Sequence, residues 1–336
     1  MIQLLVALLM WTLVASMLTL RRKRTNRTMT YASVAIAVAM TLNVDDVYVA
    51  LDPLLGGSNI TTIVSDALLM VGLFFLGRAV MKAGAYRPKL VRAAVGRTAL
   101  ITALLGIGVA FLLIDRGGTT TVFMRDLGAQ PAAAVYSIIN FTYCGIVVAA
   151  MMVLALQQTA HSSGAARIPP ILLCIGAASG VALSLVVIIM DIAHVTGALD
   201  IMYAVEHAYA MLSLTTFAFL CAGFAAQPIV TLARRKMRQV RTDVFLRQIT
   251  PIWNQAIEHR PGLSSVTACL YFVEESETRL HRAIVETYDA MLDPRAAFTI
   301  STEDRALLER AEQHLLGSRP GDSGIKLVSP HESDQS

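Results

Sequence analysis

Seven long apolar runs follow one another through the first two thirds of the sequence. They occupy residues 2–20, 28–44, 60–76, 98–114, 132–156, 169–190 and 201–226. A helix needs about 20 apolar residues to cross a bilayer. The runs are continuous rather than alternating, which excludes a membrane β-barrel. The sequence therefore predicts an all-α membrane protein: a seven-transmembrane-helix bundle with a small, mainly helical C-terminal domain.

Charge divides the chain into two parts. Residues 1–242 hold 19 Lys or Arg and 9 Asp or Glu, whereas residues 243–336 hold 9 and 15. We therefore predict a membrane bundle over 1–232, a basic juxtamembrane segment over 233–242 and an acidic helical domain over 243–317. Residues 318–336 are rich in Ser, Gly, Pro and Asp, which predicts a disordered tail.

The basic residues also predict an orientation. Seventeen Lys or Arg fall in one alternating set of loops, whereas the opposite set holds only Arg116 and Arg125. Loops rich in Lys and Arg stay in the cytoplasm. We therefore expect the N-terminus outside and the C-terminus inside. Basic residues follow run 2–20 rather than precede it, so we interpret it as a first span and not as a signal peptide.

Five ionisable residues in or beside the runs form the candidate polar membrane site. Asp66 lies in the third run, Asp191 and His194 end the sixth, and Glu206 and His207 begin the seventh. Such groups usually face a bundle interior or water. Carboxylates and imidazoles together can bind a divalent metal or carry protons. Solvation at a helix end is the favoured alternative, because no metal-ligand spacing is present.

Gly176 and Gly180 form a small-xxx-small pair in the sixth run. Such pairs allow two helices to approach closely. Seven helices already supply partners, so packing within the bundle is favoured over dimerisation, and a homo-oligomer stays open.

Familiar catalytic motifs are absent from the sequence. It has no Gly-rich phosphate loop, no His-Glu-x-x-His and no Gly-x-Ser-x-Gly. We therefore predict no catalytic, cofactor or metal site, and an enzyme is not favoured. The basic stretch 234–241 is attracted to anionic headgroups. The lipid bilayer is thus a predicted partner, and nucleic acid is not.

The part after residue 242 is predicted to be mainly helical. Helices are expected over 243–259, over 274–292 and from 301 or 302 to 316, whereas 266–273 fits a strand or a buried helix. On the 274–292 helix, four apolar residues share a face: Leu280, Ile284, Tyr288 and Met291. Four charged residues on another face are a candidate surface for a cytoplasmic protein partner: Arg279, Arg282, Glu286 and Asp289. A solvated face is the more common explanation.

Several short motifs carry a family resemblance. They are Thr250-Pro251-Ile252-Trp253, Pro261, Arg279-Leu280-His281-Arg282 with Glu286 and Asp289, and the turn Gly56-Gly57-Ser58-Asn59-Ile60. The chain resembles an actinobacterial family of seven-helix membrane proteins that are labelled transporters and carry a cytoplasmic domain of unknown function. The resemblance implies a bacterial plasma membrane.

Two functional hypotheses follow. In the first, the bundle is a receptor or anchor that couples a membrane or extracellular signal to a cytoplasmic domain that binds a partner. In the second, the bundle transports a small solute. The first is favoured, because no internal repeat and no mid-membrane helix break is evident.

Overall fold

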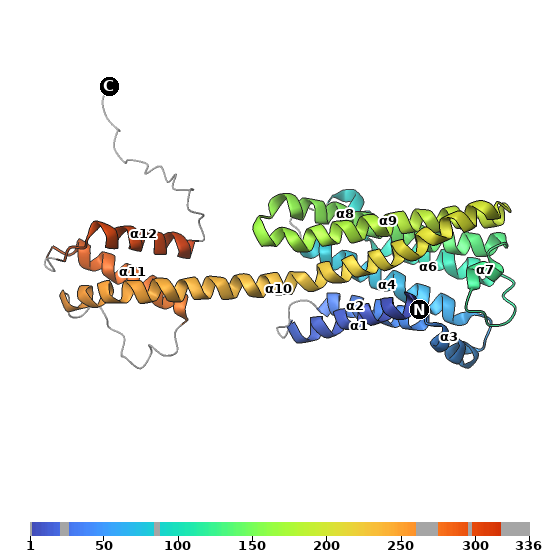
Figure 1. The fold of residues 1–336 in the computed structure, drawn as a ribbon, viewed down its shortest axis with the longest axis horizontal. Helices are drawn as coiled ribbons and strands as arrows, with labels where there is room; N and C mark the ends of the chain where they lie inside the picture. Colours follow the sequence, from blue (N-terminus) through green and yellow to red (C-terminus); the bar gives the residue numbers. More distant parts are fainter. Residues whose placement is uncertain (1, 21–26, 84–87, 260–274, 295–297, 317–336) are drawn as a thin grey trace, which may run out of the picture. The chain divides into compact units, whose positions relative to one another are not determined.

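Helices provide all the regular structure of residues 2–20, 27–83, 88–259, 275–294 and 298–316, which a computed structural model of the 336-residue chain describes (Figure 1). The all-α prediction is confirmed for these residues. The chain divides into two compact units, Met1–Val230 and Thr231–Ser336. The predicted strand or helix over 266–273 and the predicted tail over 318–336 lie outside the described residues.

The first unit contains all seven predicted apolar runs, and each of them lies on a helix. Its long helices are α1 (Ile2–Leu20), α2 (Arg27–Leu42), α4 (Ile60–Ala83), α6 (Arg97–Leu112), α8 (Pro131–His161), α9 (Ile168–Val195) and the first part of α10 (Leu199–His259). Its short helices are α3 (Asp45–Leu51), η1 (Asp52–Leu55), α5 (Lys89–Ala94), α7 (Phe123–Leu127) and η2 (Gly164–Arg167).

Among the described residues, four helices are long and apolar enough to cross a membrane. They are α4, α8, α9 and α10, and the pair formed by α2 with α3 and η1, bent by 84°, would be a fifth. At 1.5 Å per residue, a 16-residue helix such as α2 or α6 rises about 24 Å, which is less than the ~30 Å of a bilayer core. The seven-span count therefore stays a prediction.

Aromatic rings hold α6, α7 and α8 together. The ring centroids of Phe111, Phe123 and Tyr136 lie 5.8 to 6.3 Å apart, within the range of favourable aromatic pairs. All three side chains are buried. This cluster fixes the position of Tyr136, which matters for the site described below.

Glycines bring α9 and α10 into close contact. A Cβ atom on Gly176 would lie 2.8 Å from the backbone nitrogen of Leu220, and one on Gly180 would lie 3.1 Å from Thr216. On α10, a Cβ atom on Gly223 would lie 3.0 Å from the backbone nitrogen of Leu173. The predicted glycine pair therefore packs against α10 inside the unit.

The second unit is built from the later turns of α10 together with α11 (Ser276–Leu292) and α12 (Thr302–Leu316). Its main core contains eight buried residues: Leu246, Ile249, Trp253, Leu280, Ala283, Ile284, Leu308 and Ala311. The predicted helix over 274–292 is confirmed as α11. Its predicted apolar face is also confirmed, because Leu280 and Ile284 are buried and Tyr288 and Met291 pack beside them.

The seventh run and the predicted helix over 243–259 are continuous in the structure. Both belong to one 61-residue helix, α10, which contains Pro228 and Pro251. A proline removes one backbone donor and strains the preceding turn, which costs about 3 kcal/mol. The helix continues through both prolines, with long helical stretches on either side of Pro228.

Candidate functional site

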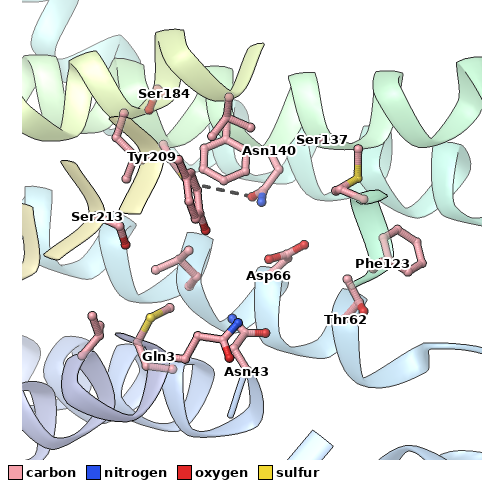
Figure 2. A pocket seen from close by; sticks show the side chains of 18 of the residues that line it. Gln3, Asn43, Thr62, Asp66, Phe123, Ser137, Asn140, Ser184, Tyr209 and Ser213 are labelled. Atoms are coloured by element: carbon pink, nitrogen blue, oxygen red, sulfur yellow. Dashed lines mark hydrogen bonds between the residues drawn. The ribbon is translucent and has the colours of Figure 1, made fainter. Parts of the chain in front are cut away.

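A cavity of about 760 Å³ lies inside the first unit. Its walls come mainly from α4, α8, α9 and α10, and the ends of α1 to α3 and α7 complete it. Figure 2 shows Asp66 in this space, with Asn140 and Tyr209 across from it. Small-molecule sites in proteins commonly have volumes of about 300 to 1,000 Å³. The cavity is therefore large enough for a small ligand.

Two helices line the cavity with the same residue spacing. The lining residues on α4 are Thr62, Asp66, Leu69 and Leu73. On α9 the same steps join Gly180, Ser184, Val187 and Asp191, with Leu183 and Met190 beside them. Steps of four, three and four residues keep side chains on one face of a helix. One face of α4 and one face of α9 thus line the cavity.

The cavity has a polar end and an apolar end. The polar end lies toward α3 and α7, which occupy the same end of the bundle in Figure 1, and includes Asp66, Ser137 and Asn140. The other end is lined by Leu73, Val148 and Leu220, together with the hydroxyl residue Thr216. An amphipathic ligand would match this gradient.

Asp66 is held by a hydrogen bond from a neighbouring helix. The hydroxyl of Tyr136 on α8 donates to Asp66 Oδ2 over 2.5 Å. Tyr136 is 2% exposed, and the aromatic cluster with Phe111 and Phe123 fixes its ring. Asp66 itself is half-buried and lines the cavity. The carboxylate therefore has a set orientation.

Asp191 lies in the cavity wall without such support. It is 4% exposed, and its Oδ2 atom has no hydrogen-bond partner within the described part of the chain. Ser137 on α8 interacts with this carboxyl, but its Oγ atom is likewise buried without a hydrogen bond there. A buried polar atom left unpaired costs about 1 to 3 kcal/mol, and a charged one costs more. Asp191 Oδ2 is thus a buried carboxyl oxygen without a hydrogen bond in the described part of the chain.

The charged residues around the cavity are mostly acidic. Asp45, Asp66 and Asp191 line it, and Arg125 is the one Lys or Arg among the lining residues. Asp45 and Arg125 are exposed, whereas the two deeper charged residues are both acidic. The interior of the cavity therefore favours cations over anions.

A second polar region joins the turn before α4 to the loop after α6 by hydrogen bonds. Asp52 is fully buried and accepts hydrogen bonds from the backbone nitrogens of Asn59 and Thr61, both at 2.9 Å, and from Thr119 Oγ1 at 2.7 Å. Asn59 is also fully buried. Its Nδ2 atom donates to the carbonyls of Arg116 and Gly118. We call the network around Asp52 and Asn59 the loop knot.

The turn before α4 makes the loop knot possible. Residues Gly56, Gly57, Ser58 and Asn59 all have positive φ, from 59° to 104°. Asn visits this region more readily than most non-glycine residues. Asn59 Oδ1 also accepts from Thr120 N at 2.8 Å and from the Tyr48 hydroxyl at 3.0 Å. The turn thus positions every polar atom of the Asn59 side chain.

The predicted polar cluster of α9 and α10 is only partly assembled. Asp191 lines the cavity together with Asp66, whereas His194 packs against Gly128 and does not line it. His207 is exposed and also lies outside the lining, and the side chain of Glu206 lies outside the described part of the structure. No group of three His, Cys, Asp or Glu that could hold a metal occurs among the described residues.

The four residues of the predicted partner face on α11 differ in burial and in hydrogen bonding. Glu286 accepts a 2.7 Å hydrogen bond from the indole nitrogen of Trp253 within the second unit. Arg279 and Arg282 are half-buried, and Asp289 is exposed. Glu286 therefore serves the core of this unit, and a partner surface that includes all four residues stays a prediction.

Several cavity residues were not singled out as ligands from the sequence, among them Tyr136, Ser137, Asn140 and Tyr209. The signal that could have indicated them is the four-residue spacing of lining residues on α8, from Tyr136 through Asn140 and Cys144 to Val148, and on α10, from Tyr209 through Ser213 to Phe217. Comparison with protein-family models, curated proteins and solved structures found no match to this chain.

Proposed function

We propose that this protein is a receptor-like protein of a bacterial plasma membrane. It has seven membrane spans, with its N-terminus outside and its C-terminus in the cytoplasm. A small ligand enters the cavity from the outer side through the end near α3 and α7. The second unit lies in the cytoplasm, where it binds a protein partner.

The role of α10 in both units supports this proposal most strongly. Its early turns give Tyr209, Ser213 and Thr216 to the cavity wall. Its later turns give Ile249 and Trp253 to the core of the second unit. Ligand binding that changes the free energy of one part of a helix can change that of the other, which is the thermodynamic basis of coupling between sites.

Hydrogen exchange on the full chain tests this coupling without a known ligand. Ser213→Trp places a large ring in the cavity, whereas Met211→Trp places the same ring on the surface of the same helix, where Met211 is 72% exposed. We expect Ser213→Trp to change amide exchange in α11 and α12 several-fold, and Met211→Trp to leave it unchanged. Changes confined to the first unit with Ser213→Trp would refute the coupling.

Transport of a small solute is the second candidate. The cavity supports it, because polar residues line one end and apolar residues the other, as in a transporter open to one side. The unbroken helices α4, α8 and α9 favour the receptor instead. Uptake of a ligand into proteoliposomes, lost with Asp66→Asn, would favour transport.

The orientation can be tested separately. Gly118, in the loop knot, and Ala165, in η2, are both exposed. With native cysteines replaced, a Cys at Gly118 should react with an impermeant maleimide on intact cells. A Cys at Ala165 should react only after permeabilisation. The reverse pattern would invert the proposed topology.

A further inference from the structure

We propose that the cavity binds a small organic cation, a protonated amine with an apolar body, and that Asp191 is its counter-ion. This inference rests on the proposed function, in which the cavity holds a ligand. It specifies the chemical class of that ligand and the residues that recognise it.

The first step concerns Asp191 and its missing partner. The residue is 4% exposed, lines the cavity and has an Oδ2 atom without a hydrogen bond in the described part of the chain. Buried charges in proteins are normally paired. Because Arg125, the one Lys or Arg of the lining, is exposed, a ligand is the group that can supply a buried positive charge.

The second step distinguishes an organic cation from a metal ion. Structural and catalytic sites for zinc and similar transition metals use three or four protein ligands in fixed geometry. No group of three suitable His, Cys, Asp or Glu residues occurs among the described residues. An ammonium group, in contrast, carries three donors that hydroxyl and carboxylate oxygens can accept in a flexible arrangement.

The third step identifies the acceptors beside Asp191. Ser137 Oγ is buried without a hydrogen bond in the described residues and belongs to the helix that faces Asp191. Asp66 lines the same cavity, and its carboxylate accepts from Tyr136 and interacts with Asn140. The carboxylate of Asp191 and the hydroxyl of Ser137 are therefore the acceptors for the donors of the ammonium group, and Asp66 adds a second carboxylate to the cavity wall.

The fourth step concerns the body of the ligand. Aromatic side chains of the wall, Phe141, Tyr209 and Phe217, offer π faces to a cation or to an apolar group. Leu69, Leu73 and Leu220 line the deeper part. A ligand with its charge at the polar end and an apolar body of moderate size would fill about 760 Å³ better than a small inorganic ion.

Binding of defined amines to the purified full chain tests the inference. The probes are butylamine, phenethylamine and tryptamine, with 2-phenylethanol as a neutral control and 3-phenylpropionate as an anionic control. Thermal unfolding in detergent is followed against ligand concentration, since a ligand that binds the folded state raises its melting temperature. We expect at least one amine to stabilise the protein, and both controls to have no effect.

Variants then localise the effect. Asp191→Asn should weaken amine binding more than about tenfold, because it removes the charge of the counter-ion. Ser137→Ala should weaken it about threefold to tenfold, the usual effect of one hydrogen bond. Asp46→Asn, an exposed carboxylate outside the lining, should leave binding unchanged.

Three outcomes would overturn the inference: no amine stabilises the protein, 2-phenylethanol binds as well as the amines, or Asp191→Asn binds amines like the wild type. Failure of the proposed function is distinguishable. An amine that binds without changing hydrogen exchange in α11 and α12 supports the site and refutes the coupling. If Ser213→Trp changes hydrogen exchange in α11 and α12 but no amine binds, the coupling is supported and the amine site is refuted.

Discussion

The loop knot and the cavity are both polar regions of the first unit, and they differ in how their buried aspartates are paired. In the loop knot, Asp52 accepts three hydrogen bonds and the Asn59 side chain uses all its donors and acceptors. In the cavity, Asp191 Oδ2 and Ser137 Oγ have no hydrogen bond among the described residues.

The difference separates a structural role from a binding role. A buried carboxylate whose hydrogen bonds are complete stabilises the fold, because removing it leaves its donors unpaired. A buried carboxylate that lacks a partner weakens the fold until a ligand binds. Pairing therefore tells more about the role of these aspartates than burial does, since both are almost fully buried.

The largest expected effect comes from the loop knot. Asp52→Ala should lower the free energy of unfolding by about 3 to 5 kcal/mol, because three donors lose a charged acceptor. Unfolding in detergent measures this change. Asp46→Ala, on the neighbouring helix α3 and exposed, should cost less than about 1 kcal/mol. Equal effects of the two substitutions would contradict the role assigned to the loop knot.

A smaller loss should come from the close contact between α9 and α10. Gly176→Ala places a Cβ atom 2.8 Å from the backbone nitrogen of Leu220 and should cost about 1 to 3 kcal/mol. Gly108→Ala on α6, where nothing lies within 4 Å, should instead stabilise the protein by up to about 1 kcal/mol. The same unfolding measurement decides this. If Gly176→Ala is harmless, α9 and α10 do not pack as closely as the contact with Leu220 requires.

Asp191→Asn should have the opposite sign to Asp52→Ala. Without ligand, Asp191→Asn should leave the free energy of unfolding unchanged or raise it by up to about 1 kcal/mol, because an unpaired carboxyl group becomes a neutral amide. The melting temperature in detergent measures this change. The comparison between the two regions fails if Asp191→Asn destabilises the protein by more than about 1 kcal/mol.

The smallest effect concerns a polar group of the second unit. Burial lowers the pKa of His314, and Arg238 and Arg241 lower it further, whereas Glu277 opposes them. The unfolded chain therefore binds a proton more readily near pH 6.5. This contribution to stability is present above pH 6.5 and is lost as the pH falls below it.

We expect the second unit to melt at a slightly lower temperature at pH 5.5 than at pH 7.5. Much of this difference should disappear in His314→Gln, which keeps a side chain able to bond Thr242 Oγ1, now 2.9 Å from His314 Nε2. An unchanged pH dependence in His314→Gln would assign the effect to other groups.

The sequence predicted the helical part of the fold well. Apolar runs of about 20 residues have few alternatives to helices, so all seven were located. The number of spans does not follow from the runs alone, because α2 and α6 have only 16 residues and α2 bends into α3. The unbroken α10 was missed, because Pro228 and the basic residues after it resemble the end of a membrane helix.

The site was predicted only in part. Asp66 and Asp191 were singled out because charge is costly in a membrane, and both line the cavity. Local sequence does not show which face of a helix meets a neighbour, so the places of His194 and His207 could not be foreseen. Asp52 and Asn59 were missed as a pair, because their partners Thr119 and Arg116 lie about 60 residues away.

The separation between Asp52 and Thr119 also has a consequence for biosynthesis. The two residues are 67 positions apart, with α4 and α6 between them. At about 5 to 20 residues per second, a ribosome needs roughly 3 to 13 seconds to make that stretch. During this interval Asp52 lacks one of its donors and Asn59 lacks two backbone acceptors. The loop knot therefore closes only after α6 has been made, and a chain arrested earlier exposes an incomplete polar surface to cellular quality control.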